Sequence, residues 1–93
     1  MRHIDRSGAF KRQYKTMLKR GKNQQKLQAI IVLLANDEPL PASCRDHALV
    51  GNLVGFRDCH IEPDWLLIYA KADTEDGQGV LRLEMTGSHS DLF

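Results

Sequence analysis

The spacing of apolar residues in the first third of the chain predicts two helices. A first helix over about 7–20 follows from an apolar stripe at spacings of four and three, formed by Phe10, Tyr14 and Met17. Ser7 is a suitable N-cap for it, and Gly21 is typical of the residue just past a helix end. A second helix should begin after Asn23 and end near Ala35, with a buried stripe of Leu27, Ile30, Ile31 and Leu34.

The second half of the chain has the patterns of strands. Residues 56–61 alternate, which places Asp58 and His60 on one face and Cys59 on the other. Residues 65–69 are continuously apolar, as in a strand covered on both faces. Residues 80–86 alternate again and predict three inward side chains, Leu81, Leu83 and Met85, between outward Arg82 and Glu84.

This order of elements predicts one α+β domain over 1–93, with two N-terminal helices packed on an antiparallel β-sheet. Residues 2–5 are a candidate edge strand ahead of the helices, and Pro39 and Pro41 mark a loop after them. No apolar stretch is long enough for a membrane span and no signal peptide is visible, so we expect a cytoplasmic protein. Its two cysteines, Cys44 and Cys59, are then expected to be reduced.

Charge is divided unevenly along the chain. Residues 1–30 hold nine Lys or Arg against one acid, whereas residues 31–93 hold four basic residues and eleven acids, although the net charge is only +1. Lys15 and Lys19 belong to the basic surface predicted for the first helix. Such a surface suits a polyanion or an acidic partner, and it is also compatible with an ordinary solvated helix.

Histidines and a carboxylate are the candidates for chemistry. If consecutive strands pair, His60, Asp64 and His89 can converge at one end of the sheet. Cleavage of RNA by its own 2′-hydroxyl needs a base, an acid and a cationic group at the phosphate. Imidazoles suit the first two roles and Arg82 or Arg57 the third, while Trp65 and Phe93 offer surfaces for bases. Taken singly, a histidine in a strand is more often structural than catalytic, and Trp65 at the start of an apolar run is more typical of the core.

Other kinds of site are poorly supported. A metal site is disfavoured because Cys59 and His60 are neighbours in a strand and point to opposite faces, and the chain has no paired zinc-ligand spacing. No phosphate-binding loop, dinucleotide fingerprint or nucleophile elbow is present. We therefore expect neither a metal nor a cofactor.

Longer motifs carry a specific resemblance. The segments RDHALVGNLVGFRDCHIEPDWLLIYA (45–70) and LRLEMTGSHSDLF (81–93) are similar to those of the YafQ-type toxins of the RelE/ParE superfamily, bacterial type II toxin–antitoxin endoribonucleases. The resemblance implies the RelE-type microbial ribonuclease fold and metal-independent cleavage of mRNA in the ribosomal A site. It also implies an antitoxin partner of the DinJ type, through which the complex would bind operator DNA.

The same resemblance implies a set of site residues. The catalytic positions fall on His47, His60, Asp64 and His89, and the RNA-binding positions on Trp65, Arg82 and Phe93. Lys15 and Lys19 would hold ribosomal RNA on the 70S ribosome. In the implied scheme His89 and either His47 or His60 form the acid–base pair. The alternatives are a toxin of the same fold that acts on DNA gyrase, and a binding module without catalysis.

Overall fold

Local capping signals set the limits of the two long helices in the computed structural model, which describes residues 1–93. Helix α1 (Gly8–Lys19) begins where the Ser7 side chain accepts a hydrogen bond from the Phe10 N–H. It is followed by Gly21 at a φ of 85°, a left-handed conformation that favours glycine. Helix α2 (Gln24–Ala35) begins after Asn23, whose side chain accepts from the Gln25 N–H. Both predicted helices are thus confirmed.

Five strands form one sheet in the spatial order β1-β5-β4-β3-β2. Their bounds are β1 His3–Arg6, β2 His47–Ala48, β3 Arg57–Glu62, β4 Trp65–Ala72 and β5 Val80–Gly87. The α+β prediction is confirmed, but the sheet is not antiparallel throughout. Strand β1 pairs in parallel with β5 because the helical hairpin carries the chain away before it returns through β2 to β5.

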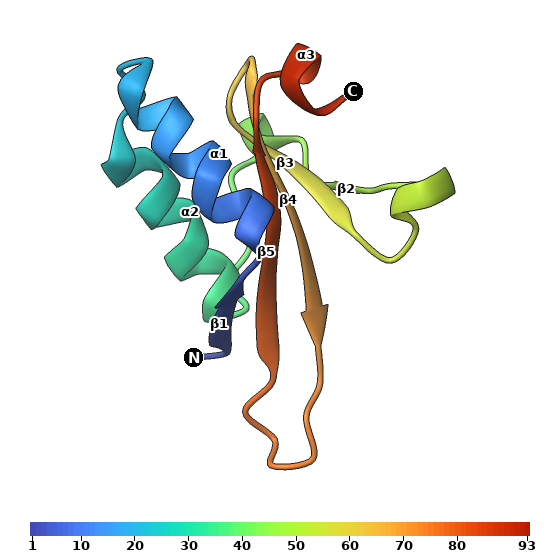
Figure 1. Cartoon of the computed structure of the whole chain (residues 1–93). Coiled ribbons are helices and arrows are strands. Elements are labelled where there is room, and N and C mark those ends of the chain that lie inside the picture. The colour runs from blue at the N-terminus through green and yellow to red at the C-terminus, as the bar shows by residue number, and fades with distance from the viewer.

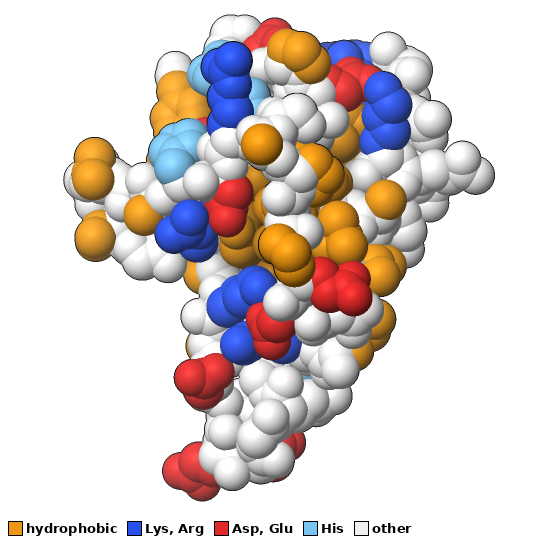
Figure 2. Space-filling model, turned by 180° about the vertical axis from the view of Figure 1, so that it is seen from behind, with side chains coloured by type: hydrophobic (Ala, Val, Ile, Leu, Met, Phe, Trp, Pro, Cys, Tyr) orange, Lys and Arg blue, Asp and Glu red, His pale blue; other side chains and the backbone are white.

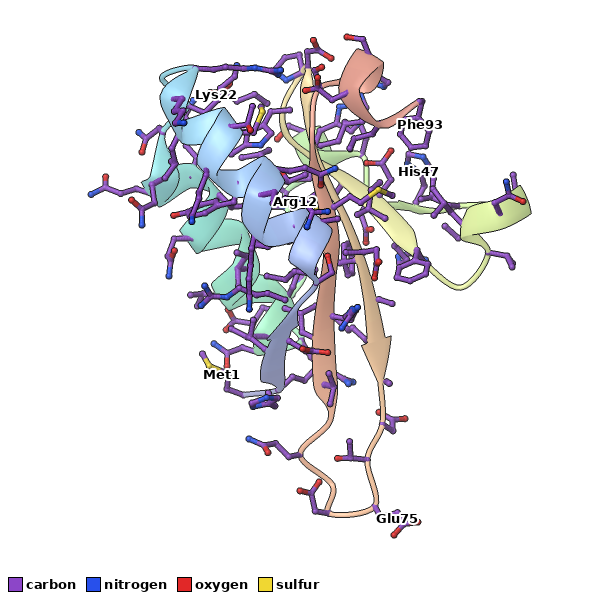
Figure 3. The ribbon with its side chains drawn as sticks, in the orientation of Figure 1. Met1, Arg12, Lys22, His47, Glu75 and Phe93 are labelled. Carbon is purple, nitrogen blue, oxygen red and sulfur yellow. The ribbon has the colours of Figure 1, made fainter.

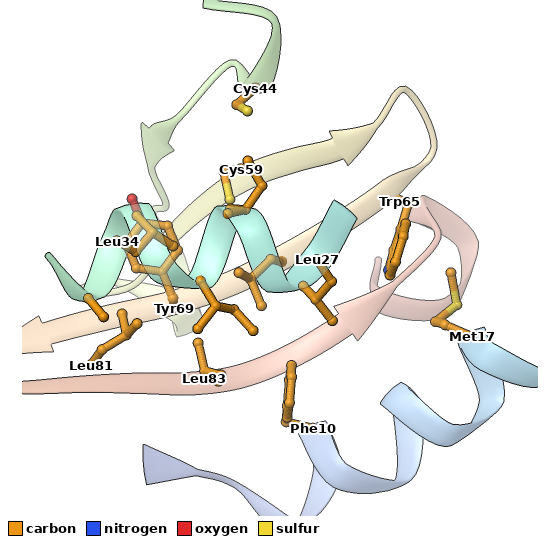
Figure 4. Packing of buried hydrophobic residues seen from close by; sticks show 14 residues of the cluster. Phe10, Met17, Leu27, Leu34, Cys44, Cys59, Trp65, Tyr69, Leu81 and Leu83 are labelled. Atoms are coloured by element: carbon orange, nitrogen blue, oxygen red, sulfur yellow. The ribbon is translucent and has the colours of Figure 1, made fainter. Parts of the chain in front are cut away.

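Helices α1 and α2 cover one face of the sheet only, as Figure 1 shows. The core lies between that face and the helices and holds Phe10, Met17, Leu27, Leu67 and Leu83 (Figure 4). The apolar run of β4 is fully buried from Trp65 to Tyr69, as its pattern predicts.

A β-bulge in β5 changes which side chains face the helices. The pairing of β4 with β5 shifts between Ile68 and Tyr69, so Glu84 is an extra residue with no partner in the ladder. Beyond it Thr86 faces the core and is fully buried, whereas Met85 shares the other face with Ile68 and is only partly buried. The prediction of an inward Met85 is therefore wrong. The Glu84 carbonyl accepts a hydrogen bond from the Ser7 hydroxyl at 2.6 Å.

Short elements complete the chain. Two 3-10 turns, η1 (Ala42–Cys44) and η2 (Gly51–Leu53), flank β2, and a final helical turn, α3 (His89–Leu92), follows β5. The hairpin of β4 and β5 extends beyond the rest of the fold, with Glu75 at its tip (Figures 1 and 3). None of the helices is long and apolar enough to cross a membrane.

Candidate active site

The candidate catalytic residues lie on the face of the sheet that α1 and α2 leave open. His60 pairs with Leu66 across the β3–β4 ladder, while Asp58 is the cross-strand partner of both Ile68 and His47. Cross-strand partners point to the same face, and the alternate residues Cys59 and Leu67 pack in the core below. The alternation therefore carries polar groups to the open face while the same strands build the core.

His89 and Asp64 are joined by two hydrogen bonds. The backbone N–H of His89 donates to Asp64 Oδ1 at 3.0 Å, and ring Nδ1 lies 3.2 Å from the same oxygen. These bonds, with the positive charge that His89 can carry, hold the pKa of Asp64 below its usual range. The carboxylate is thus ionised and accepts from Nδ1–H, which leaves Nε2 of His89 free to exchange a proton with a ligand.

A capping box fixes the position of His89. The Ser88 side chain accepts from the Asp91 N–H, and the Asp91 carboxylate accepts from the Ser88 N–H. Arg20, the C-cap residue of α1, binds both oxygens of the same carboxylate, at 2.6 and 3.2 Å. This ion pair ties α3 to the helical layer.

Three aromatic rings form a row at this end of the sheet. The ring centroids of His60 and His89 are 5.7 Å apart in an edge-to-face arrangement. The ring centroid of Phe93 lies 6.4 Å from that of His89, and the Phe93 side chain is largely exposed. His47 lies 3.7 Å from Asp58, a carboxyl that His60 and His89 also approach. Two distant segments of the chain, 45–70 and 81–93, are therefore brought together through His47, His60, His89 and Phe93.

His47 is held by a backbone carbonyl. Its Nδ1 lies 2.7 Å from the carbonyl oxygen of Arg45, which can only accept, so Nδ1 carries a proton. The opposite nitrogen, Nε2, is 3.7 Å from Asp58 Oδ2. This nitrogen therefore faces the Asp58 carboxylate and is available for proton exchange.

Asp58 was not among the predicted site residues. Its side chain is buried, and Oδ1 has no hydrogen-bond partner. Burial raises the pKa of Asp58, and the three histidines around it act in the opposite direction: His47, His60 and His89. The signal in the sequence was the alternation that puts Asp58 on the same face as His60.

Two of the predicted RNA-binding residues, Trp65 and Arg82, do not lie beside the histidine cluster. Trp65 is fully buried on the helix side, where its Nε1–H donates to the Thr86 hydroxyl at 2.9 Å. The prediction that Trp65 stacks on a base is therefore corrected. Arg82 is on the open face but is bound to Asp5 at 2.7 Å and to Glu84 at 3.1 Å. It is four residues along the ladder from the row of His60, which is about 13 Å.

The remaining basic candidates lie outside the histidine cluster. Arg57 is engaged by Asp46, which also accepts from the Tyr69 hydroxyl at 2.7 Å. Lys15 and Lys19 are exposed on α1, on the helix side of the molecule. Figure 2 shows the histidines gathered near one end of the molecule, with a Lys or Arg side chain beside them.

This arrangement can transfer two protons at once. His89 and His47 each present Nε2 while a carboxylate stabilises the charged ring, and His60 lies between them beside the buried Asp58. An acid and a base on opposite sides of a phosphodiester are what general acid–base cleavage requires. No three His, Cys, Asp or Glu side chains are placed to share a metal ion.

Comparison with known proteins gives consistent matches along the whole chain. The family model described as "Bacterial toxin of type II toxin-antitoxin system, YafQ" matches residues 2–93. The mRNA interferase toxin YafQ of Escherichia coli K12 is 44% identical over 93 residues, which is 99% of this chain and 96% of that protein. A crystal structure of YafQ from E. coli BL21(DE3) superposes with a TM-score of 0.89 at 42% identity, covering 100% of this chain and 99% of that one. YafQ in the E. coli DinJ–YafQ complex gives 0.87 at 44% identity, with the same coverage.

Proposed function

Since this chain belongs to the YafQ family of bacterial type II toxins, we propose that it is an endoribonuclease that inhibits translation by cleaving mRNA in the A site of the ribosome. The observation that carries the proposal is the pairing of His89 with Asp64 opposite His60. The relatives named above are mRNA interferases, and the polar residues implied by the resemblance to catalyse cleavage meet on one face of this sheet.

The reaction proposed is attack by the 2′-hydroxyl on the adjacent phosphorus. A base removes the 2′ proton, the new P–O bond forms, and an acid protonates the 5′ oxygen as its bond to phosphorus breaks. The products are a 2′,3′-cyclic phosphate and a 5′-hydroxyl. His89 acts as one member of the acid–base pair, and His47 or His60 as the other. Asp64 and Asp58 stabilise the imidazolium forms.

We propose that this cleavage needs no metal ion. The nucleophile belongs to the substrate itself, and imidazoles supply the proton transfers that a metal-bound hydroxide would otherwise provide. Phe93, which is largely exposed beside His89, offers a surface on which a base of the substrate can stack. The ribosome would present the mRNA in a fixed geometry next to these groups.

The proposed partner is an antitoxin of the DinJ type. The E. coli relative forms a complex with DinJ, and the toxin chain in that complex aligns with all of this one. Such an antitoxin would inhibit the toxin, and the complex would bind operator DNA through the antitoxin.

Regulated expression in a bacterial host tests the proposal. Wild-type protein should arrest growth, co-expressed DinJ-type antitoxin should restore it, and arrested cells should contain mRNA cut within codons. Purified toxin that has been treated with EDTA should cut ribosome-bound mRNA as well as untreated toxin does. Growth arrest with intact mRNA and supercoiling-deficient DNA would instead indicate the gyrase-directed alternative.

A further inference from the structure

One arginine of this protein is free beside the histidine cluster. The guanidinium groups of Arg2, Arg20, Arg57 and Arg82 are bound to carboxylates. The other three arginines have no side-chain partner: Arg6, Arg12 and Arg45. Among these, only Arg45 lines a cavity to which a site histidine, His60, also contributes.

This cavity has a volume of about 430 Å³ and lies between α2, η1 and the outer edge of β3. It is open there because the two-residue strand β2 pairs only with Arg57 and Asp58, so the edge of β3 from Cys59 onward has no neighbouring strand. Five of the seven residues that line it are polar or charged: Lys26, Ser43, Arg45, His60 and Glu62.

The electrostatics of the cavity favour an anion. Its one carboxylate, Glu62, is bound at 2.9 Å by Lys22 and at 2.9 Å by Lys26, and both lysines keep its pKa below the usual range. Two ammonium groups therefore face one carboxylate, and the guanidinium of Arg45 adds a further positive charge. His60 supplies the only aromatic ring in this lining, so a cavity with this positive charge suits a phosphate better than a base.

We propose that this cavity binds a backbone phosphate of the mRNA next to the phosphate that is cleaved, with Arg45 as the main ligand. The proposal rests on the ribonuclease function proposed above. His60 belongs both to the cavity and to the catalytic cluster, so a strand held by Arg45 is led directly onto the histidines. The carbonyl of Arg45 also holds His47 Nδ1 at 2.7 Å, and binding at Arg45 therefore stabilises the orientation of His47.

A binding experiment without cleavage tests the site itself. The probe is a trinucleotide with 2′-O-methyl riboses, which lacks the nucleophile and cannot be cut, titrated into ¹⁵N-labelled protein. Amide signals of Arg45, His60 and Glu62 should shift, and Arg45→Gln should weaken binding roughly tenfold, with partial recovery in Arg45→Lys. Arg12→Gln is the matched control, because Arg12 is also unpaired but lies on α1 (Figure 3), and it should bind as wild type does.

A kinetic experiment on the ribosome locates the phosphate. A neutral methylphosphonate beside the cleavage site should lower the cleavage rate of wild-type protein roughly tenfold. The cleavage rate of Arg45→Gln should be the same on this mRNA as on natural mRNA. The proposal would be overturned if the effects of Arg45→Gln and of the methylphosphonate on the cleavage rate add. It would also be overturned if Arg45→Gln binds the trinucleotide as tightly as wild type does. Loss of antitoxin binding in Arg45→Gln, with RNA binding intact, would reassign the cavity to an acidic antitoxin segment. Arg45-dependent binding without any cleavage by wild type would keep the phosphate site and reject the nuclease function.

Discussion

His89 donates two hydrogen bonds to one carboxylate oxygen of Asp64, from its backbone N–H at 3.0 Å and from ring Nδ1 at 3.2 Å. Asp64 comes from the turn between β3 and β4, and His89 begins α3. The contact therefore fixes both the position of the helical turn and the orientation of the ring.

Replacing this carboxylate should reduce cleavage without unfolding the protein. Asp64→Asn keeps an acceptor for Nδ1–H but removes the charge that stabilises the imidazolium, so we expect kcat on ribosome-bound mRNA to fall about 10- to 100-fold. The fold should survive because the Asp64 side chain is 68% exposed. Asp73→Asn, at an almost fully exposed carboxylate of the hairpin, is the control. Equal rates for Asp64→Asn and wild type would remove Asp64 from the mechanism.

Asp58 should control the pH dependence of cleavage. The carboxyl of Asp58 is surrounded by His47, His60 and His89, whose charges oppose the rise that burial gives its pKa. Asp58→Asn removes this negative charge from the cluster, so the pH–rate profile of cleavage should be displaced to lower pH. The profile of kcat against pH, measured with natural mRNA on ribosomes, gives the answer. A profile identical to that of wild type would show that the histidines do not sense this charge.

The same variant makes a prediction for stability. Because burial raises the pKa of Asp58 in the folded state, the stability linked to its proton is fully present below the unfolded pKa of about 3.9 and is lost as pH rises through the folded value. Asparagine does not titrate, so Asp58→Asn does not lose stability through this proton. The variant should therefore gain unfolding free energy relative to wild type between pH 3.5 and pH 7, as measured by urea unfolding. If the difference in unfolding free energy between the variant and wild type does not change with pH, the pKa of Asp58 is not raised by folding.

Trp65 should act on stability and leave the chemistry unchanged. Trp65→Phe removes the hydrogen bond to Thr86 and leaves a cavity where the buried indole packed, so it should lower the free energy of unfolding by about 2–4 kcal/mol. Thr86→Val should cost about 1–3 kcal/mol, because it leaves the buried Nε1–H of Trp65 and the Leu66 carbonyl without their side-chain partner. Cleavage rates per folded molecule should stay near those of wild type. Loss of cleavage by Trp65→Phe with unchanged stability would restore Trp65 as an RNA contact.

Sequence reasoning succeeded where the determinants are local. Ser7, Gly21 and Asn23 mark helix ends through bonds and torsions of their own neighbourhood, and both helices were predicted within a residue. The bulge at Glu84 could not be predicted, since nothing in an alternating strand shows where an extra residue is inserted. That bulge exchanged the roles of Met85 and Thr86.

The meeting of the candidate site residues could be predicted for a different reason. Chain order and strand pairing could suggest that His60, Asp64 and His89 meet, and their distances agree. An RNA-binding role for Trp65 was suggested by its aromatic ring and by the resemblance, whereas its apolar surroundings in the sequence indicated the core, where the structure places it. Arg45 could not be recognised because its free guanidinium depends on which arginines find carboxylates in the folded chain.

The basic surface of α1 should contribute to ribosome binding. Lys15 and Lys19 are one helical turn apart and exposed, so they can contact phosphates from one side. Lys15→Glu with Lys19→Glu should weaken binding to 70S ribosomes at least tenfold at low salt and reduce the dependence of affinity on salt. Gln78→Glu, which adds negative charge at the hairpin tip, should bind as wild type. Unchanged affinity in the double variant would leave these lysines as a solvated surface.

The most direct test is primer extension on a defined mRNA in a purified translation system, with wild-type protein and His89→Ala. We predict cuts at A-site codons with wild type and a rate at least about 100-fold lower with His89→Ala, because that change removes an acid–base group. Urea unfolding of both proteins controls for loss of fold. Equal cleavage by the two folded proteins would contradict the histidine mechanism, and no cleavage by folded wild type would contradict the ribonuclease function.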